Sequence, residues 1–344
     1  MTSLRRLVLD LRTQRPVWRV PPDVVSAVRR ALGPGWEAIE VETPVSSDGD
    51  GGSGSPEAIA AARGAEVYFG FGVPPGVVTA GRDTLRWVHS CTAGVGSSLE
   101  ALRGSSIRLT NSAAVHAEPI ADWVIAALAH FAKGFDHVVR AQAERRWIQG
   151  AYGERVIRVR ELADIRVGIL GLGGIGSAVA RRALALGMRV AGVRRHPERG
   201  GPSGTAWVGG LTDLPRLAME SDALVIAAPR TRETDAAVSR DILARLPADA
   251  VVINVSRGAL LDERALLERL DAGLLRGAAL DVFATEPLPP EHPLWTHPRV
   301  LVSPHVSPVT ERFWERESGL ILDNIGRYLA GSALVNQVDL DAGY

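Results

Sequence analysis

The sequence predicts an α/β protein of two lobes, one of them a Rossmann-type, doubly wound dinucleotide-binding domain. The first observation is length, because 344 residues exceed one average domain. The second is the alternation of short apolar runs with helix-length connections, which is typical of parallel sheets covered by helices. The third is a glycine-rich turn that follows one apolar run and opens a helix.

Composition excludes several classes of protein. Basic and acidic residues cancel at 39 each, which argues against a nucleic-acid or anionic-membrane partner held by bulk charge. The single cysteine, Cys91, excludes an intrachain disulfide framework and a multi-cysteine metal site. The N-terminal apolar run is only LVLDL, and no stretch approaches the length of a transmembrane helix. We therefore expect a soluble, cytoplasmic protein without a metal.

The N-terminal lobe shows three strand candidates, at 5–11, 65–70 and 85–90, separated by helix-like segments such as 21–32. Residues 43–56, TPVSSDGDGGSGSP, are almost all turn formers and predict a solvent loop. Long helical text follows from about residue 116 to 147. Its apolar part, IADWVIAALAHFA, has too few polar positions for a solvated face, so we expect it to be buried between lobes or subunits.

The second lobe is indicated by five apolar runs in regular succession. They lie at 165–170, 189–193, 223–228, 250–255 and 277–282, with helix-length connections between them. The rhythm predicts a parallel sheet with helices on both faces. The tail, 307–331, returns to an amphipathic helix pattern.

The glycine turn predicts a site for a dinucleotide pyrophosphate. In the segment GILGLGGIGSAVARRALALG, Gly171 permits the tight turn, Gly173 lets the backbone approach the pyrophosphate, and Gly176 lets the helix pack on the strand. The anion is expected at the free N–H groups around Gly174 and Ile175. A glycine-rich turn in an ordinary βαβ unit is the alternative, but the strand–turn–helix–strand context favours the dinucleotide.

Three stretches downstream each follow a strand-like run. They are INVSRGALLDERAL (253–266), AALDVFATEPLPP (278–290) and LVSPHVSPVT (301–310). Ligands of open α/β sheets bind at the carboxyl ends of the strands. The three stretches bring one Arg, one acid and one His to that edge, namely Arg257, Glu286 and His305.

The glycine loop and the segments NVSRG, LDVFATEP and SPH, in this order and spacing, resemble the NAD(P)-dependent D-2-hydroxyacid dehydrogenase family over nearly the whole chain. The resemblance implies reduction of a small 2-oxo acid, such as glyoxylate, hydroxypyruvate or pyruvate, to a D-2-hydroxy acid. It implies that Arg257 binds the substrate carboxylate and polarises the keto oxygen. His305 would give or take the proton, and Glu286 would pair with it.

Elementary chemistry agrees with these roles. The arginine fork matches a planar carboxylate in a way that lysine cannot reproduce. Negative charge grows on the keto oxygen as hydride arrives, so a cation and a proton source are needed. Histidine can supply that proton near neutral pH, and a carboxylate beside it favours its charged form.

The resemblance also implies contacts to cofactor and substrate. Asp281 matches the position that contacts the nicotinamide carboxamide. The resemblance also implies that the cofactor is bound by Pro229, Thr234 and Val255. The loop CTAGVG is similar to the family's loop whose backbone N–H groups hold the substrate carboxylate, which points to Ala93, Gly94 and Val95. A discontinuous, flavodoxin-like substrate domain of residues 1–111 and 304–344 is implied, around a Rossmann domain of residues 112–303. The helices from 116 to 147 would form much of a homodimer interface.

The end of the second Rossmann strand bears on the choice of cofactor. No Asp or Glu occurs from Gly171 to Pro197, and Arg194, Arg195 and His196 stand where an acid would accept the ribose hydroxyls. Guanidinium groups can bind a 2′-phosphate, so we expect NADP, with NAD as the alternative. If Arg194 instead stacks on adenine or points to solvent, the protein would be indifferent between the two.

Other functions remain open on this fold. A dinucleotide-sensing, corepressor-like binding protein could retain the same three residues, and turnover with 2-oxo acids discriminates the two. Formate enzymes of this type carry Gln where Glu286 stands, and phosphite enzymes use a lysine in the first lobe, which this lobe does not have. A phosphorylated substrate is possible because Arg63, Arg82 and Arg86 lie in the first lobe.

Overall fold

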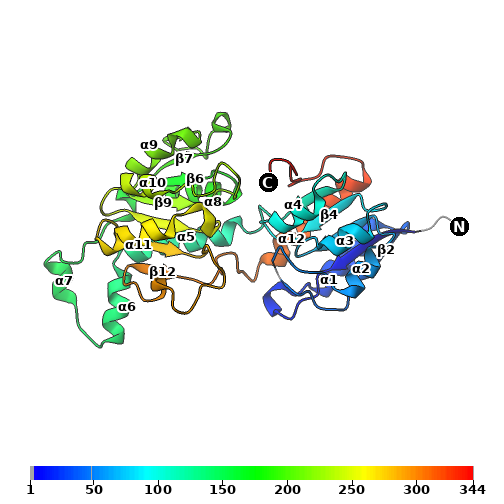
Figure 1. Ribbon diagram of the computed structural model, residues 1–344, viewed down its shortest axis with the longest axis horizontal. Helices are drawn as coiled ribbons and strands as arrows, with labels where there is room; N and C mark the ends of the chain where they lie inside the picture. The colour runs from blue at the N-terminus through cyan, green and yellow to red at the C-terminus, as the bar shows by residue number, and fades with distance from the viewer. Residues whose placement is uncertain (1–3, 48, 344) are drawn as a thin grey trace. The chain divides into compact units, whose positions relative to one another are not determined.

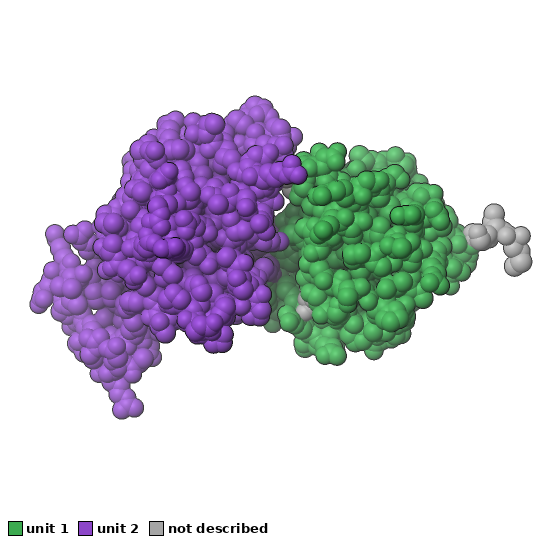
Figure 2. All heavy atoms as spheres, viewed as in Figure 1, with its two compact units in different colours: residues 1–116, 309–344 green, residues 117–308 purple. Residues whose placement is uncertain are grey.

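The computed structural model describes residues 4–47 and 49–343. The chain divides into two compact units, coloured separately in Figure 2. Unit 1 comprises residues 1–116 and 309–344, and unit 2 comprises residues 117–308. The chain passes from one unit to the other after residues 116 and 308. Each boundary lies five residues further along the chain than the expected one, after 111 or 303.

Unit 1 contains a parallel sheet of five strands in the order β2-β1-β3-β4-β5. This is the order of flavodoxin-like sheets, with the first strand between the second and the third. The strands are β1 (Arg5–Asp10), β2 (Trp36–Glu40), β3 (Val67–Gly70), β4 (Trp87–Ser90) and β5 (Arg108–Asn111). The helices are α1 (Pro22–Leu32), α2 (Pro56–Ala62), α3 (Pro75–Ala80), α4 (Gly96–Leu102) and α12 (Phe313–Leu329) (Figure 1).

Side-chain alternation along the strands explains why helices cover both faces of this sheet. In β1, Leu7 and Leu9 belong to the core with residues of α1 and α12. Val8, between them, belongs to the opposite core with residues of α2, α3 and α4. Successive side chains of a strand point to opposite faces, so a strand that is apolar throughout needs a cover on each side.

Unit 2 contains a parallel sheet of seven strands in the order β12-β11-β10-β9-β6-β7-β8. The strand order reverses between β6 and β9, where dinucleotides bind in doubly wound folds. The strands are β6 (Arg166–Leu170), β7 (Arg189–Val193), β8 (Trp207–Gly209), β9 (Ala223–Ile226), β10 (Val251–Asn254), β11 (Gly277–Leu280) and β12 (Val300–Val302). The fold is therefore a Rossmann-type domain joined to a second α/β domain.

Two cores again flank the sheet of unit 2. Residues of α5 (Ala117–Ala132) and α8 (Gly174–Ala185) pack on one face. Residues of α9 (Leu214–Met219), α10 (Arg240–Arg245) and α11 (Glu263–Asp271) pack on the other. The apolar helix that we expected between lobes or subunits is α5, and its buried side chains, Val124 and Phe131 among them, pack within unit 2 itself.

The long helical text after residue 116 is broken at one glycine. Gly134 has a φ of 69°, a left-handed conformation that side chains with a Cβ rarely adopt, and α5 ends just before it. The chain continues as α6 (Phe135–Ala143) and α7 (Gln149–Gly153), which project from the rest of unit 2 in Figure 1. We call residues 135–159 the arm. Within the described residues, we find no helix with the length and apolar character needed to cross a bilayer.

Candidate active site

The three residues singled out at strand ends come from neighbouring strands of unit 2. Arg257 follows β10, Glu286 follows β11, and His305 follows β12, and these strands are adjacent in the sheet. Because all three run parallel, their carboxyl ends lie at the same edge. The fold therefore gathers residues that are far apart in the sequence.

Glu286 and His305 form a direct pair. The Nδ1 atom of His305 lies 2.8 Å from Oε2 of Glu286. The second oxygen, Oε1, accepts the backbone N–H of Phe283 at 2.9 Å, which fixes the carboxylate from its own loop. Both members of the pair are partly exposed, His305 by 43% and Glu286 by 36% of the side chain, so the pair is accessible to a substrate.

The charge state of Glu286 follows from this environment. Burial raises the pKa of its carboxyl group, but the hydrogen bonds from His305 and Phe283 oppose that effect. The charges of His305 and Arg257 act in the same direction as the hydrogen bonds, and together they hold the pKa of Glu286 below its ordinary value. Glu286 is thus a carboxylate at neutral pH.

Arg257 has an exposed side chain, and its Nη1 donates to the carbonyl oxygen of Ser256 at 2.7 Å. Gly258, the next residue, makes a close backbone contact that the sequence pattern did not reveal. A Cβ there would lie 1.9 Å from the carbonyl carbon of Phe283 and 2.2 Å from the nitrogen of Ala284. The loop that carries Arg257 therefore touches the loop that carries Glu286, backbone to backbone, and only glycine permits that approach.

The glycine turn has the geometry that a dinucleotide requires. Gly171 has a φ of 99°, and a Cβ on it would lie 2.5 Å from backbone atoms of Ala228. At Gly176 a Cβ would lie 1.9 Å from the oxygen of Gly171, so helix and strand touch here. At Gly173, by contrast, a Cβ would meet nothing within 4 Å. This opening lies beside the first N–H groups of α8, at Gly174 and Ile175, which have no partner inside the helix.

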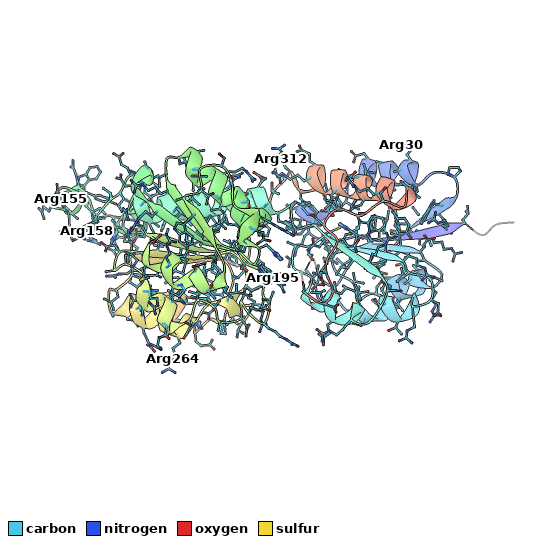
Figure 3. The ribbon with its side chains drawn as sticks, turned by 90° about the horizontal axis from the view of Figure 1, so that it is seen from above. Arg30, Arg155, Arg158, Arg195, Arg264 and Arg312 are labelled. Carbon is cyan, nitrogen blue, oxygen red and sulfur yellow. The ribbon has the colours of Figure 1, made fainter. Side chains whose placement is uncertain are left out.

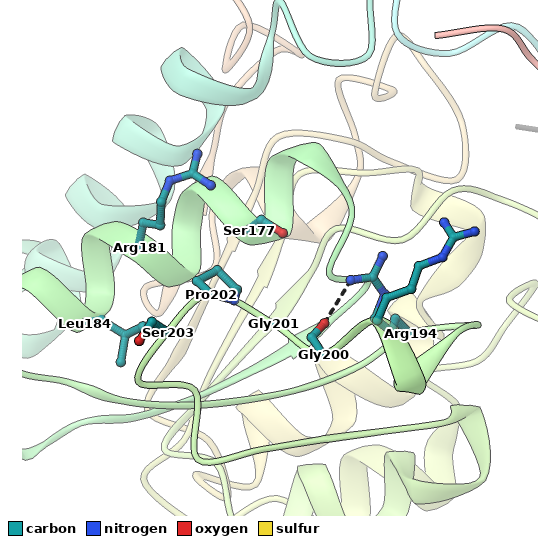
Figure 4. A pocket seen from close by; sticks show the side chains of 9 residues that line it. Ser177, Arg181, Leu184, Arg194, Gly200, Gly201, Pro202 and Ser203 are labelled. Carbon is teal, nitrogen blue, oxygen red and sulfur yellow. Dashed lines mark hydrogen bonds between the residues drawn. The ribbon is translucent and has the colours of Figure 1, made fainter. Parts of the chain in front are cut away.

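The end of β7 lies beside an arginine-lined pocket. Arg194 follows the strand directly, and its Nη1 donates to the carbonyl oxygen of Gly200 at 2.9 Å (Figure 4). Both residues line an open pocket of about 450 Å³ whose walls include Ser177, Arg181 and Arg199. The other lining residues are Leu184, Gly201, Pro202 and Ser203. Of these arginines, only Arg194 was singled out from the sequence, because the others lie on separate elements.

Four more residues expected at the cofactor lie close to strand ends. Arg195 is exposed beyond β7, where Figure 3 labels it. Thr234 donates its hydroxyl to the carbonyl oxygen of Pro229 at 2.6 Å in the segment after β9. Val255 is buried directly after β10.

Asp281 is fully buried directly after β11. Its carboxylate accepts hydrogen bonds from the loop that carries His305, namely from the hydroxyl of Ser303 and the backbone N–H groups of Val306 and Ser307. Sequence reasoning placed Asp281 only against a cofactor and did not foresee these contacts.

The loop CTAGVG of unit 1 lies between β4 and α4. Asn111 donates its amide to the carbonyl oxygen of Ala93 at 2.9 Å, and the hydroxyl of Thr92 donates to that of Gly94 at 2.8 Å. The side chain of Val95 is buried. One side chain of the loop itself and one from the end of β5 therefore fix the shape of this loop.

A buried polar cluster lies at the start of that loop and was not foreseen. Nε2 of His89 lies 2.7 Å from Oε1 of Glu317 on α12, and Nδ1 lies 2.8 Å from the hydroxyl of Thr110. Cys91 completes a group whose nitrogen, sulfur and oxygen atoms lie within 4.8 Å of one another. Both ring nitrogens of His89 already have protein partners, and burial raises the pKa of the Cys91 thiol. The cluster therefore ties β4 to α12.

Known proteins resemble the chain over most of its length. The family model for the NAD binding domain of D-isomer specific 2-hydroxyacid dehydrogenases matches residues 125–307. The glyoxylate/hydroxypyruvate reductase A of Yersinia enterocolitica is 30% identical over 280 residues, which cover 79% of this chain and 85% of that protein. A second such reductase, from Serratia proteamaculans, shows the same identity and coverage.

Two solved structures are similar across almost the whole chain. A D-isomer specific 2-hydroxyacid dehydrogenase from Xanthobacter autotrophicus, in complex with NADPH and MES, is 30% identical with a TM-score of 0.78 and covers 99% of this chain and 100% of its own. An NADPH-dependent glyoxylate/hydroxypyruvate reductase from Sinorhizobium meliloti, in complex with NADP and sulfate, is 25% identical with a TM-score of 0.75. It covers 99% of this chain and 100% of its own.

Proposed function

Because the chain belongs to the D-isomer specific 2-hydroxyacid dehydrogenase family, we propose that it reduces a small 2-oxo acid to a D-2-hydroxy acid with NADPH. The observation that carries the proposal is the pair of His305 and Glu286, 2.8 Å apart on the loops after β12 and β11. Relatives that are 30% identical are named for glyoxylate and hydroxypyruvate. These two acids are therefore the first substrates to try.

In the proposed reaction, Arg257 and His305 act on the substrate, and Glu286 acts on His305. Arg257 binds the planar carboxylate and stabilises the negative charge that grows on the keto oxygen. His305 gives a proton to that oxygen, while Glu286 holds the ring through Nδ1, so that Nε2 is the atom that exchanges the proton. Bound NADPH supplies the hydride for the carbonyl carbon. Hydride and proton together convert the keto group to a hydroxyl group.

For the cofactor, we propose that the 2′-phosphate of NADP lies at the arginine-lined pocket. Arg194 and Arg199 place guanidinium groups at its wall, and Arg181 adds a third from α8. A phosphate there would find charge-assisted donors, whereas the ribose hydroxyls of NAD would find no carboxylate at the end of β7. We place the pyrophosphate of the cofactor at the glycine turn, beside the N–H groups of Gly174 and Ile175.

We also propose that the protein forms a homodimer through the arm. This segment exposes large apolar side chains that a monomer would leave in water. Those at least 39% exposed are Phe135, Val138, Val139, Trp147, Val156 and Val159. So many exposed apolar side chains on one projecting segment are typical of a surface that another protein covers.

Turnover with a panel of 2-oxo acids, each with NADPH and NADH, tests the proposal. Glyoxylate or hydroxypyruvate should be reduced, and His305→Ala should lower kcat about 100-fold or more while NADPH still binds. His292→Ala is the matched control, because this histidine of unit 2 caps a short helix and should leave kcat unchanged. Failure with every acid, or near wild-type turnover of His305→Ala, would contradict the proposed reaction.

A further inference from the structure

His305 has an unusual backbone conformation. Its φ of 55° lies in the left-handed region, which residues with a Cβ seldom adopt. Its N–H donates to the carbonyl oxygen of Ser303 at 3.1 Å, which closes a tight turn around Pro304. A residue in such a conformation persists only where its surroundings hold it there. The direction of the imidazole therefore depends on what secures this turn.

Asp281 is the group that secures it. The carboxylate lies at the end of β11, with no exposed surface, and the Asp281 N–H donates to the carbonyl oxygen of Asn254 at 3.0 Å. The residue is thus attached to the sheet itself, so its side chain is a fixed point for the neighbouring loop.

Asp281 accepts hydrogen bonds from donors on both sides of His305. The hydroxyl of Ser303 reaches Oδ1 from the N-terminal side of the turn. From the C-terminal side, the N–H of Val306 donates to Oδ1 and the N–H of Ser307 donates to Oδ2, each at 2.9 Å. Both carboxylate oxygens are therefore engaged, and the turn is held at its two ends.

We propose that Asp281 is a positioning residue for the proton donor: it holds the turn at residues 303–307 so that the His305 ring meets Glu286. The inference rests on the proposed function, because it assigns His305 that role. It differs from a contact to the nicotinamide carboxamide in its consequence, since losing a positioning residue harms turnover more than cofactor binding. Asp281 acts through the turn and touches no reacting atom.

Substitutions at two positions separate these roles. Asp281→Asn keeps the shape of the side chain, but its amide NH₂ cannot accept a hydrogen bond, so at least one donor of the turn loses its partner. Ser303→Ala removes only the hydroxyl bond, and Ser303→Thr restores a hydroxyl at the same place. Asp222→Asn is the matched control. Asp222 accepts hydrogen bonds from the backbone N–H and the side chain of Arg166, at the edge of the sheet where the strands begin.

The decisive readout does not need turnover. The His305 ring is followed by NMR through a pH titration of the protein without cofactor, with the signal assigned from His305→Asn. In Asp281→Asn and Ser303→Ala, the titration midpoint should move toward that of Glu286→Gln, because the ring no longer meets the carboxylate. Ser303→Thr and Asp222→Asn should titrate as the wild type does.

Turnover and NADPH binding complete the test. Asp281→Asn should lower kcat about 100-fold with the dissociation constant of NADPH little changed. If Asp281→Asn weakens NADPH binding but leaves the His305 titration unmoved, the proposal is overturned in favour of a cofactor contact. If Asp281→Asn does not fold, an unmoved His305 titration in Ser303→Ala overturns the proposal. If the wild type reduces no 2-oxo acid, the proposed function fails, yet a moved titration still supports the positioning role.

Discussion

At the scale of single residues, the neighbours of Glu286 decide its charge state. The pKa of Glu286 lies below its ordinary value although burial raises it, because hydrogen bonds and the charges of His305 and Arg257 outweigh burial. The carboxylate therefore stays negative as the pH falls toward the ordinary glutamate range. This carboxylate lies 2.8 Å from Nδ1 of His305, the residue that gives the proton in the proposed reaction.

Removing that charge should change the pH profile of reduction in a defined direction. The proton-bearing form of His305 is lost as pH rises, so the rate declines on the alkaline side. In Glu286→Gln, kcat/KM for reduction should begin to decline at lower pH than in the wild type. Glu291→Gln, an exposed change in the same loop, should leave the profile unmoved. Superimposable profiles of Glu286→Gln and the wild type would refute the pairing.

We predict that the choice between cofactors depends on one side chain at the end of β7, that of Arg194. Arg194→Asp would place a carboxylate where the 2′-phosphate is proposed to lie, so it both removes a cation and repels the phosphate. The ratio of kcat/KM for NADPH over NADH should exceed one in the wild type and fall about 100-fold or more in the variant, chiefly through KM. Arg189→Asp, at the opposite end of the strand, should leave the ratio intact. A wild type that prefers NADH would show that this part of the proposal is wrong.

The residues of the proposed active site were easier to infer from the sequence than the residues that contact the backbone of another loop. Arg257, Glu286 and His305 each follow an apolar run, so strand ends and chemical type suffice to select them. Gly258 is defined by its approach to Phe283, a contact between two loops that no local pattern encodes. The hydrogen bonds of Asp281 to the turn are likewise a product of the folded sheet.

At the scale of elements, continuous burial made strands predictable. The five apolar runs of the second lobe are all strands, because a strand covered on both faces is apolar throughout. β2 and β8 lie at the edges of their sheets, and their side chains are only partly buried, so the apolar signal fades there. The helical text expected from 116 to 147 divides at Gly134 because this residue is left-handed, and composition alone does not reveal the place of the break.

The glycine turn allows packing and binding to be separated in one element. Gly176→Ala would press a Cβ against the oxygen of Gly171, so it should lower the free energy of unfolding by about 1–3 kcal/mol and weaken NADPH binding as well. Gly173→Ala meets open space and should change stability by less than about 0.5 kcal/mol. It should still weaken NADPH binding, because its methyl group fills the proposed pyrophosphate site.

Chemical denaturation and NADPH titration of the two variants check this prediction. Equal stability losses in Gly173→Ala and Gly176→Ala would mean that the two glycines serve the same purpose. Undiminished NADPH affinity in Gly173→Ala would place the pyrophosphate elsewhere.

At the scale of the whole molecule, the chain builds unit 1 from both of its ends. His89 on β4 and Glu317 on α12 are 228 residues apart in the sequence, yet they form a buried pair that joins the two segments of the unit. Sequence periodicity indicates a helix at the tail but contains no information on where that helix packs. The discontinuous unit was therefore expected only from the resemblance to a family, and the buried pair was not expected at all.

The exposed apolar surface of the arm is the basis of the proposed dimer. Val139 is 59% exposed and Trp147 is 90% exposed, although both side chains are apolar. If a second copy covers them, sedimentation at micromolar concentration should report twice the chain mass of 36.7 kDa. Val139→Asp would bury an unpaired charge in that interface, a strong penalty that should shift the protein toward the monomer.

Met219 provides the matched control for this change. It is apolar and 50% exposed, but it lies on α9, outside the arm, so Met219→Asp should sediment as the wild type does. Trp147→Ala should also weaken the dimer, because it removes buried apolar area without adding charge. A wild type that sediments as a monomer, or a dimer that Val139→Asp and Trp147→Ala leave intact, would show that the arm is not the interface. In the latter case the exposed apolar side chains of the arm would need a different partner to explain them.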